Sequence, residues 1–472
     1  MTKAHNLGNI AKAKGLTLEE SEALHELVKV YSKHRRRNAR LTRYYDGKVR
    51  ANDVNIGIAV PEELENLEVA CTWPAKVVDS LHARSQFDAF WHSDGAVKAV
   101  FDEICEENDM QLRYSKAVVP ELKHGFVLWT LAMGDDDRAR IRAHTAQSSA
   151  ARWDGAHDRV LDGFVIVDSA KFNFDRSYKP SLVNFYTADK IVVLRRVNAT
   201  DWVAEPHPHK MGRPLMEAMV YNPTDEKPFG KSRINKAVMH LTDGYLRSML
   251  RMEVGAELFT SPQKVLLGAD DTMIEELSGS FQAYITHLFT ISPSAETGDT
   301  PEMIQLAASS MTPHIEVMRC LAANLSGSSN VPISELGVIQ DNPASAEAIY
   351  AAKEALVTEA DGLNRDNGKA LKNLMLMAYA MNEDCSWSEI PPAYRKITPH
   401  FANPATPSIV SQADAMTKIA SVDPDFAGTT AFYNQIGFDD ALIQQIVSEK
   451  AVASSRGFLS KLIEGVENGG TE

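Results

Sequence analysis

The stretch that decides the fold is 336-LGVIQDNPASAEAIYAAKEAL-356. A hydrophobic loop ends in Asp-Asn-Pro, and an alanine-rich helix is predicted to follow it. Asn342 or Ser345 can cap this helix, Pro343 can occupy its first turn, and Glu347 favours the positive end of the helix dipole. No residue in the stretch has the character of a reactive group. The sequence therefore predicts a loop followed by a helix whose start is firmly fixed.

Length and composition are those of a soluble globular protein with more than one domain. The chain has 472 residues, of which 44% are hydrophobic and 24% charged, proportions that are ordinary for such proteins. No apolar run is long enough to cross a bilayer, and the N-terminus lacks the apolar block of a secretory signal. The four cysteines are far apart in the sequence, which indicates reduced thiols in a cytoplasmic setting rather than a disulfide framework.

Charge is distributed unevenly along the chain. The net charge is −14, yet residues 1–50 carry 12 basic and 5 acidic side chains, and the remainder carries 37 and 58. A net acidic protein is not expected to bind nucleic acid over a wide surface. Much of the basic excess lies between Ser32 and Arg50. This segment is either a solvated helix face or a contact for an acidic partner or DNA.

Hydrophobic periodicity predicts a helical start, a β-rich middle and a helical second half. A capping box of Thr17 and Glu20 begins the first helix. Period-two alternation predicts strands across residues 122–222. Helices are predicted at 16–45, 72–91, 102–114, 231–259 and 311–327, and from the loop to residue 382 with an interruption or kink at Asn364–Lys369.

Every enzymatic lead fails at the level of the residues. Phe229–Ser232, FGKS, resembles the end of a phosphate-binding loop, but Asp225 stands where that motif requires glycine. His207 and His209 have a spacing that can ligate metal, without a further ligand close by. Asp135–Asp137 lack the spacing of a calcium loop, and a hairpin turn is expected there. No catalytic, cofactor-binding or metal-binding residue is predicted, and no cofactor.

Five segments, in this order along the chain, resemble a known family. They are 40-RLTRYYDGKV-49, 207-HPHKMGRPLMEAMVYNP-223, 230-GKSRINKAVMHLTDGYLRSMLRMEVGAELFTSPQKVLLG-268, 330-NVPISELGVIQDNPASAEAIYAAKEALV-357 and 402-ANPATPSIVSQADAMTKI-419. Together they resemble the portal proteins (head-to-tail connectors) of long-tailed bacteriophages, siphophage type. The strand in 213-RPLMEAMVYN-222 departs from the more uniformly aliphatic strand of that family.

The resemblance implies an α+β phage-portal fold assembled as a ring, with an α/β wing, long stem helices, a small mixed clip and an α-helical crown. The expected boundaries are the wing at 1–230, stem helix 1 at 231–259, the clip at 260–309, stem helix 2 at 310–327, the tunnel loop at 328–345, a long kinked helix with the return strand of the wing at 346–405, and the crown at 406–472.

The resemblance also implies a function without enzymatic activity. The ring would form the channel at the unique capsid vertex through which double-stranded DNA is packaged and ejected. Its expected partners are further copies of itself (a dodecamer in the family), the DNA, the large terminase subunit, the head–tail adaptor, and the major capsid and scaffolding proteins, with no membrane. The virion is its expected location, after assembly in the bacterial host cytoplasm. The alternatives are a packaging ATPase or nuclease, and a monomeric capsid-associated adaptor.

The expected site residues belong to the tunnel loop and to the start of the helix that follows. Carboxylates repeated around a ring would repel phosphate, so the DNA path would hold DNA weakly. The loop residues expected to face DNA are Ser334, Glu335, Gln340, Asp341 and Asn342. Those expected at the helix start and at a packed interface are Pro343, Ser345, Ile349 and Leu356.

Overall fold

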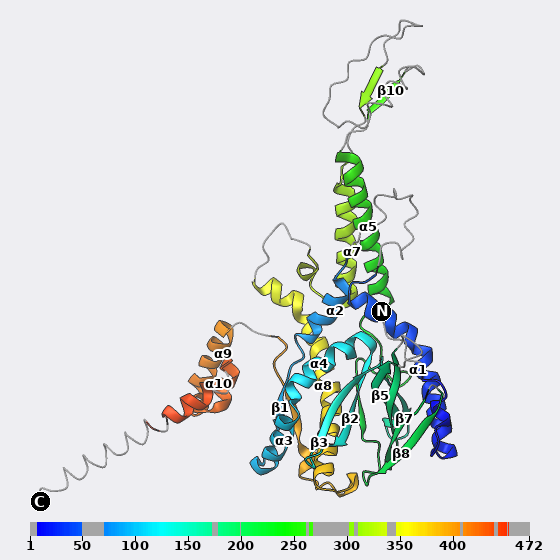
Figure 1. Ribbon diagram of the computed structural model, residues 1–472. Coiled ribbons are helices and arrows are strands. Elements are labelled where there is room, and N and C mark those ends of the chain that lie inside the picture. Colours follow the sequence, from blue (N-terminus) through cyan, green and yellow to red (C-terminus); the bar gives the residue numbers. More distant parts are fainter. Residues whose placement is uncertain are drawn as a thin grey trace, which may run out of the picture. The chain divides into compact units, whose positions relative to one another are not determined.

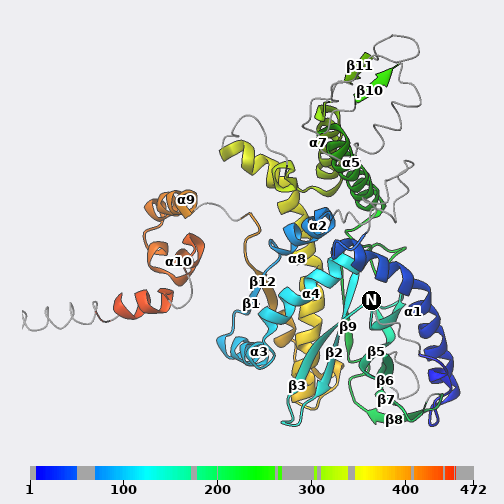
Figure 2. The same ribbon diagram turned by 45° about the horizontal axis from the view of Figure 1, so that its top comes forward.

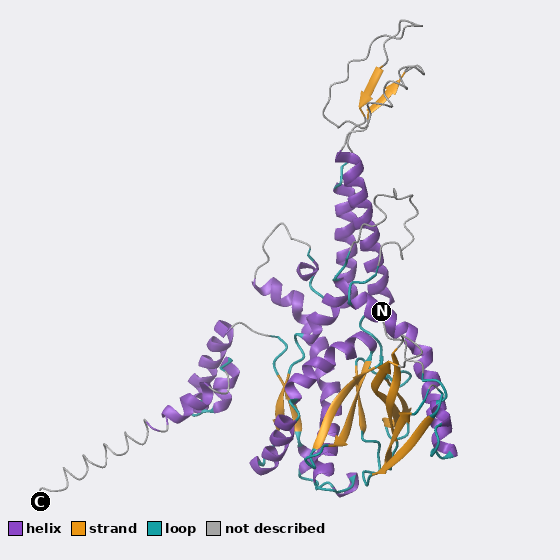
Figure 3. Cartoon of the chain, viewed as in Figure 1, coloured by secondary structure: helices purple, strands orange, loops and turns teal. Residues whose placement is uncertain are grey.

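The protein consists of two compact units, Met1–Pro404 and Ala405–Glu472. Figure 1 shows a computed structural model of the chain, and Figure 3 its helices and strands. Together they give the mixed α+β architecture that the sequence predicts. The structure describes residues 7–49, 70–171, 178–198, 200–260, 264–267, 302–305, 310–337, 346–405, 409–438, 442–450 and 452.

The strands in the described part of the first unit pair antiparallel in four sheets. A five-stranded sheet has the order β4-β5-β6-β7-β8, and a three-stranded sheet has the order β3-β2-β9. These sheets account for the period-two pattern predicted across 122–222. Their bounds are β2 Phe126–Met133, β3 Ala139–Thr145, β4 Ser149–Asp154, β5 Arg159–Lys171, β6 Tyr178–Tyr186, β7 Lys190–Arg196, β8 Trp202–Pro208 and β9 Met216–Val220. The expected hairpin turn at Asp135–Asp137 joins β2 to β3.

Helix α1 (Leu18–Tyr45) lies along the five-stranded sheet. The predicted capping box is present, because the Thr17 side chain accepts from the Glu20 N–H at 3.3 Å and Glu20 accepts from the Thr17 N–H at 2.8 Å. Leu24 and Leu27 are fully buried against Phe164 and other apolar side chains of the sheet. Burying such side chains stabilises the fold by roughly 1.5–3 kcal/mol each.

A second core joins the three-stranded sheet to the helices α2 (Trp73–His82), α3 (Gly95–Glu107), α4 (Met110–His124) and α8 (Ala346–Asn382). In Figure 2, α8 runs beside β2, β3 and β9. Gly368 in α8 makes this packing possible on the side of β12 (Thr398–Phe401), because a Cβ there would lie 2.9 Å from Pro399 Cγ.

The two predicted stem helices are α5 (Lys236–Thr260) and α7 (Thr312–Ser329), which lie side by side in Figures 1 and 2. Their buried residues belong to the larger core. Helix α5 begins five residues after the predicted start at Lys231. The cause is Asn235, whose Oδ1 accepts from the Val238 N–H at 3.0 Å, as an N-cap does. Residues before Asn235 form a turn.

Two predicted helices were wrong in part because long-range contacts override the local pattern. The helix expected across 72–91 ends at His82, and Phe87–Trp91 form β1, which pairs with β12. The helix expected at 102–114 is divided between α3 and α4. There Asn108 leaves the helix, donates to Ala139 O at 3.1 Å and accepts from the Ile141 N–H at 2.9 Å, and Asp109 adopts φ 48°.

Helix α8 is helical throughout Asn364–Lys369, where the sequence predicts an interruption or kink. Figure 2 shows that its N-terminal part runs in a different direction from the rest. The polar residues that suggested a break face a buried network. Ser85 donates to Asn364 Oδ1 at 2.6 Å, and Asn367 Nδ2 donates to Glu121 Oε2 at 3.0 Å and to Tyr114 OH at 3.1 Å. The helix therefore continues because its amides bond to other elements instead of to its own backbone.

Between the stem helices, the described part of the predicted clip contains one antiparallel pair, β10 (Lys264–Leu267) with β11 (Glu302–Gln305). The second unit is helical where described, with α9 (Ile409–Val422), α10 (Thr430–Ile436) and helical residues 442–450. Phe432 and Tyr433 lie in ring contact within it. Among the described helices, none is both long and apolar enough to cross a membrane.

Candidate functional site

The candidate site is the segment that follows α7, whose described part runs from Asn330 to Gly337. Asn330 adopts φ 57° and ends α7, and Ile333–Leu336 form one turn of 3-10 helix. Helix α2 binds this turn with two side chains. Trp73 Nε1 donates to Leu336 O at 3.3 Å, and Lys76 Nζ lies 2.9 Å from Glu335 Oε2. The position of the segment is therefore set by helix α2, more than 250 residues earlier in the chain.

Arg233, just before α5, joins three elements below this segment. Its Nε donates to Val77 O of α2 at 2.6 Å, and its Nη2 donates to Ser329 O at the end of α7 at 2.8 Å. Its Nη1 forms an ion pair with Glu359 of α8. Arg233 is 5% exposed, so its donors have been withdrawn from water and depend on these partners.

Glu359 accepts two further hydrogen bonds. We call the set of contacts among Arg233, Glu359, Ser329 and Asn330 the junction. Tyr221 OH, after β9, donates to Glu359 Oε1 at 2.5 Å, and Asn330 Nδ2 donates to Glu359 Oε2 at 3.2 Å. The contact between Asn330 and Glu359 spans 29 residues of chain. The end of α7 and the first half of α8, which come before and after the segment in the chain, are thus tied to one buried arginine. Burial raises the pKa of Tyr221 to about 12, so this phenol stays a hydrogen-bond donor at neutral pH.

The structure describes some of the site residues that the sequence predicts. Ser334 is exposed. Glu335 is half-buried and forms an ion pair with Lys76. Leu356 is fully buried in the core of its own chain. Gln340, Asp341, Asn342, Pro343 and Ser345 lie outside the described residues, as does the side chain of Ile349. Helix α8 begins at Ala346, the residue after Ser345.

The pairing of Glu335 changes one expectation. A carboxylate in an ion pair with an ammonium contributes little net charge to its surroundings, so Glu335 is not an isolated acid on the loop. The acidic character expected of this segment then falls to Asp341. The junction residues Arg233, Glu359 and Asn330 were not identified from the sequence. Their one local signal is a single arginine three residues after the turn glycine Gly230.

The residues whose sequence suggested enzymatic chemistry lie in a turn, in a hydrogen bond to the backbone, or on the surface. Gly230 adopts φ +61°, and a Cβ there would lie 2.1 Å from Tyr221 O, so this glycine permits a tight turn beside β9. Ser232 donates to Lys123 O at 2.7 Å. His207 is exposed, with Nε2 3.9 Å from a Glu205 carboxylate oxygen. Within the described ranges, no group of three metal-ligating side chains is assembled.

Comparison with known proteins gives consistent matches over most of the chain. The family model described as phage portal protein, SPP1 Gp6-like, matches residues 24–450. The portal proteins of Mycobacterium phages D29 and L5 are 22% and 23% identical over 415 residues, covering 84% of this chain and 81% of their own.

Two solved structures are also similar to the chain. A chain in the virion of a native gene transfer agent particle gives a TM-score of 0.46 at 13% identity, covering 85% of this chain and 93% of that one. A chain in the neck of the native particle, computed with C12 symmetry, gives 0.42 at 12% identity and covers 78% and 90%.

Proposed function

The chain belongs to the phage portal protein family of the SPP1 Gp6-like type, and from this premise we propose that it assembles into a closed ring around a channel for double-stranded DNA. Proteins of this family are structural, non-enzymatic components of the virion, located at its neck and portal vertex. The ATPase and nuclease alternatives are therefore set aside. The ring, the DNA channel and the docking partners are the proposal.

The observation that carries the proposal is the junction of Arg233 with Ser329 and Glu359. In a closed ring, any segment that faces the axis is repeated in every copy, and the repeated segments must stand at one height to surround a duplex. The junction would hold the segment at the same height in every copy, because it joins the end of α7 to α8 through one buried side chain. We assign the segment 328–345 to the channel wall on this basis.

The remaining elements take roles around this channel. We assign residues 1–230 and 346–405 to the wing, α5 and α7 to the stem, 260–309 to the clip and 406–472 to the crown. The large terminase subunit would dock on the ring during packaging and the head–tail adaptor afterwards. The major capsid and scaffolding proteins would hold the ring at its vertex.

The charge of the chain suits a channel through which DNA slides. The net charge is −14, and the described part of segment 328–345 contains no lysine or arginine. Each phosphate contact strengthens DNA binding and adds to its salt dependence, so a wall without cations holds DNA weakly. DNA can then slide along the wall without being held at a strong binding site.

Native mass and negative-stain microscopy of the purified chain test the proposal together. The expected result is a closed ring of identical copies with a central hole. A monomer across wide protein and salt ranges would overturn it and would favour the capsid-associated adaptor. Capsids assembled without this chain should package no DNA in a reconstituted system, whereas capsids carrying the ring should fill.

A further inference from the structure

Helix α1 presents a basic face on the side away from its buried residues. Lys33, Arg36, Arg37 and Arg40 are all exposed and are spaced i, i+3, i+4 and i+7, which places them on one face of the helix. This is the basic segment that the sequence singles out, and the proposed channel does not use it. Its position on the wing, beside the start of the stem, calls for a different partner.

One edge of this face borders a cavity of about 460 Å³. We call it the basic groove. His34 and Arg37 of α1 form one wall, and Lys227 and Lys231 form the other. The lining also includes Phe126, Phe229 and small apolar side chains, and it contains no carboxylate.

The cations of the basic groove have no anion of their own. Within the described ranges, Arg37, Lys227 and Lys231 take part in no ion pair. Burial and then Arg40 lower the pKa of Arg37, and burial, Arg37 and Lys33 lower the pKa of His34. Arg37 and His34 therefore have cationic neighbours, and an anion that entered the groove would be attracted by the cations that line it.

His124 in the lining supplies a second observation. It is 3% exposed, and its Nε2 lies 3.0 Å from Thr42 Oγ1, while its Nδ1 has no hydrogen-bond partner. A buried polar atom without a partner is uncommon in native structures. The groove is thus bordered by a buried imidazole whose hydrogen bonding is incomplete.

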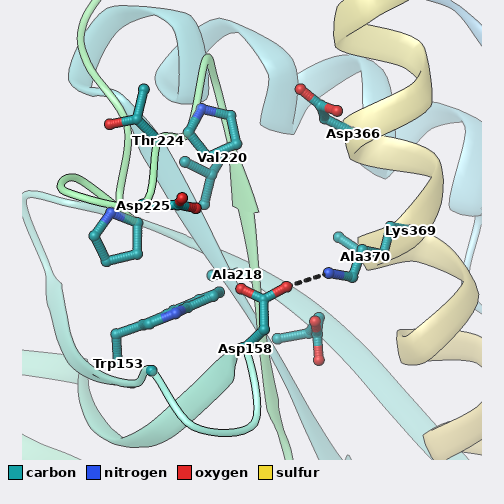
Figure 4. A pocket seen from close by; sticks show the side chains of 13 residues that line it. Trp153, Asp158, Ala218, Val220, Thr224, Asp225, Asp366, Lys369 and Ala370 are labelled. Atoms are coloured by element: carbon teal, nitrogen blue, oxygen red, sulfur yellow. Dashed lines mark hydrogen bonds and ion pairs between the residues drawn. The ribbon is translucent and has the colours of Figure 1, made fainter.

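A second pocket, lined in part by residues 223–228, has the opposite charge to the basic groove. Figure 4 shows a pocket of about 410 Å³ whose charged lining consists of Glu217, Asp158, Asp225, Asp366 and Lys369. We call it the acidic pocket. Lys369 Nζ lies 2.6 Å from Asp158 Oδ2, and Glu217 is paired with Arg213. Asp366 lies 3.7 Å from the exposed Arg365. The lining itself contains four carboxylates and one ammonium, so the pocket is negative overall.

We propose that the basic groove of one copy binds the acidic pocket of a second copy, as the lateral contact that closes the ring. The groove and the pocket flank residues 223–231, with Pro228 lining both. A heterologous, ring-closing contact requires two different patches that complement each other, and these two have opposite charge. This inference rests on the proposed ring and names the side chains that hold neighbouring copies together.

Charge reversal of each patch tests the contact. The groove variant carries Arg37→Glu, Lys227→Glu and Lys231→Glu, and the pocket variant carries Asp225→Lys and Asp366→Lys. Either variant alone brings like charges together at every contact, so ring dissociation should increase by at least about tenfold. Mixed in equal amounts, the two variants should restore rings in which they alternate, because each reversed patch then meets the opposite charge.

The control variant reverses three exposed cations elsewhere, with the changes Lys116→Glu, Arg195→Glu and Lys396→Glu, and should assemble like wild type. Neutral variants, Arg37→Gln, Lys227→Gln and Lys231→Gln together, decide the matter if reversal prevents folding. Their rings should dissociate at lower salt than wild type, with a weaker dependence on salt concentration.

The outcomes separate this inference from the proposed function. If wild type forms no ring, the proposed function fails. If wild type and both reversed variants form rings with equal salt dependence, the lateral contact is overturned and the ring stands. If the groove variant assembles normally but loses affinity for DNA or a capsid protein, the groove has that occupant and the inference is overturned as well.

Discussion

Arg233, in the turn before α5, and Glu359, in α8, form an ion pair whose arginine side chain is 3% exposed and whose glutamate side chain is 20% exposed. The pair links the base of the stem to the helix that follows the loop. Because the same arginine binds Ser329 O at the end of α7, moving the end of α7 away from α8 must break one of these buried interactions.

Replacing the arginine with an uncharged side chain of similar length should destabilise the chain strongly. Arg233→Met leaves Glu359 partly buried without its cation and removes the Arg233 donors from Val77 O and Ser329 O, of which Val77 O keeps the Ser80 hydroxyl as a donor. We expect a loss of roughly 2–4 kcal/mol in the free energy of unfolding, less than for a fully buried pair because Glu359 can regain some water. Urea unfolding measures it.

Arg365→Met is the matched control, since Arg365 lies in α8 with its side chain 81% exposed. Its effect should stay within about 0.5 kcal/mol. Equal effects of the two substitutions would show that the junction does not hold the fold together.

Removing the Trp73 N–H, which donates a hydrogen bond to the loop, should make the loop more mobile without disturbing the core. Trp73→Phe keeps an aromatic ring against Tyr245, which lies 4.3 Å away by ring centroids, and removes the N–H that binds Leu336 O. We expect a cost of about 1 kcal/mol. Hydrogen exchange should become faster for residues 333–337 and remain unchanged in β2, whereas unchanged exchange at 333–337 would mean that Trp73 does not fix the segment.

Glu121 should make stability depend on pH. It is fully buried, and its one hydrogen-bond donor is neutral Asn367. Burial raises its pKa well above the ordinary value of 4.5, so the folded state retains a proton that the unfolded state loses. The stability this group contributes is therefore present below about pH 4.5 and is lost as pH rises toward the folded-state pKa, at up to ~1.4 kcal/mol per pH unit.

Glu121→Gln keeps the shape of the protonated side chain and removes the titration. Its melting temperature should exceed that of wild type at about pH 8, and the difference should shrink toward about pH 5. Glu354→Gln, at an exposed position of α8, serves as the control and should show no such trend. A constant difference at all pH values would mean that Glu121 does not titrate in this window.

The loop acid Asp341 should keep DNA from binding to the channel wall. Asp341→Lys places a cation in every copy, and each phosphate it neutralises adds ~0.9 to the log–log salt slope of DNA binding. Rings should form normally and bind DNA more tightly, while packaging slows. Asp341→Asn should give a smaller effect, and Glu205→Lys on the wing none. Glu335 is less suitable for this test, because a lysine there would face Lys76.

Local signals in the sequence predicted those elements whose contacts are local. The capping box at Thr17 and Glu20 lies within about one turn, so four consecutive residues suffice to place the start of α1. The alternation of strands β2 to β9 likewise depends on nearest neighbours in the chain. The boundaries that failed involve distant partners, as at Phe87–Trp91, which pair with residues more than 300 positions later.

The junction could not be predicted for the same physical reason. The partners of Arg233 on α2, α7 and α8 lie 96 to 156 residues away, and no spacing in the sequence relates them. The amides of Asn364 and Asn367 gave a misleading signal, because such residues usually end helices. Here Ser85, Tyr114 and Glu121 bind them instead.

The measurement that tests the central claim most directly is photo-crosslinking to DNA during packaging. A benzophenone side chain in place of the exposed Ser334 reports whether the segment after α7 faces the duplex, and one in place of Leu112, 54% exposed on α4, reports on the wing. In motors stalled with DNA in the channel, the account predicts crosslinks from position 334 and none from position 112. Crosslinks from position 112 alone, or none from position 334 in filled rings, would contradict it.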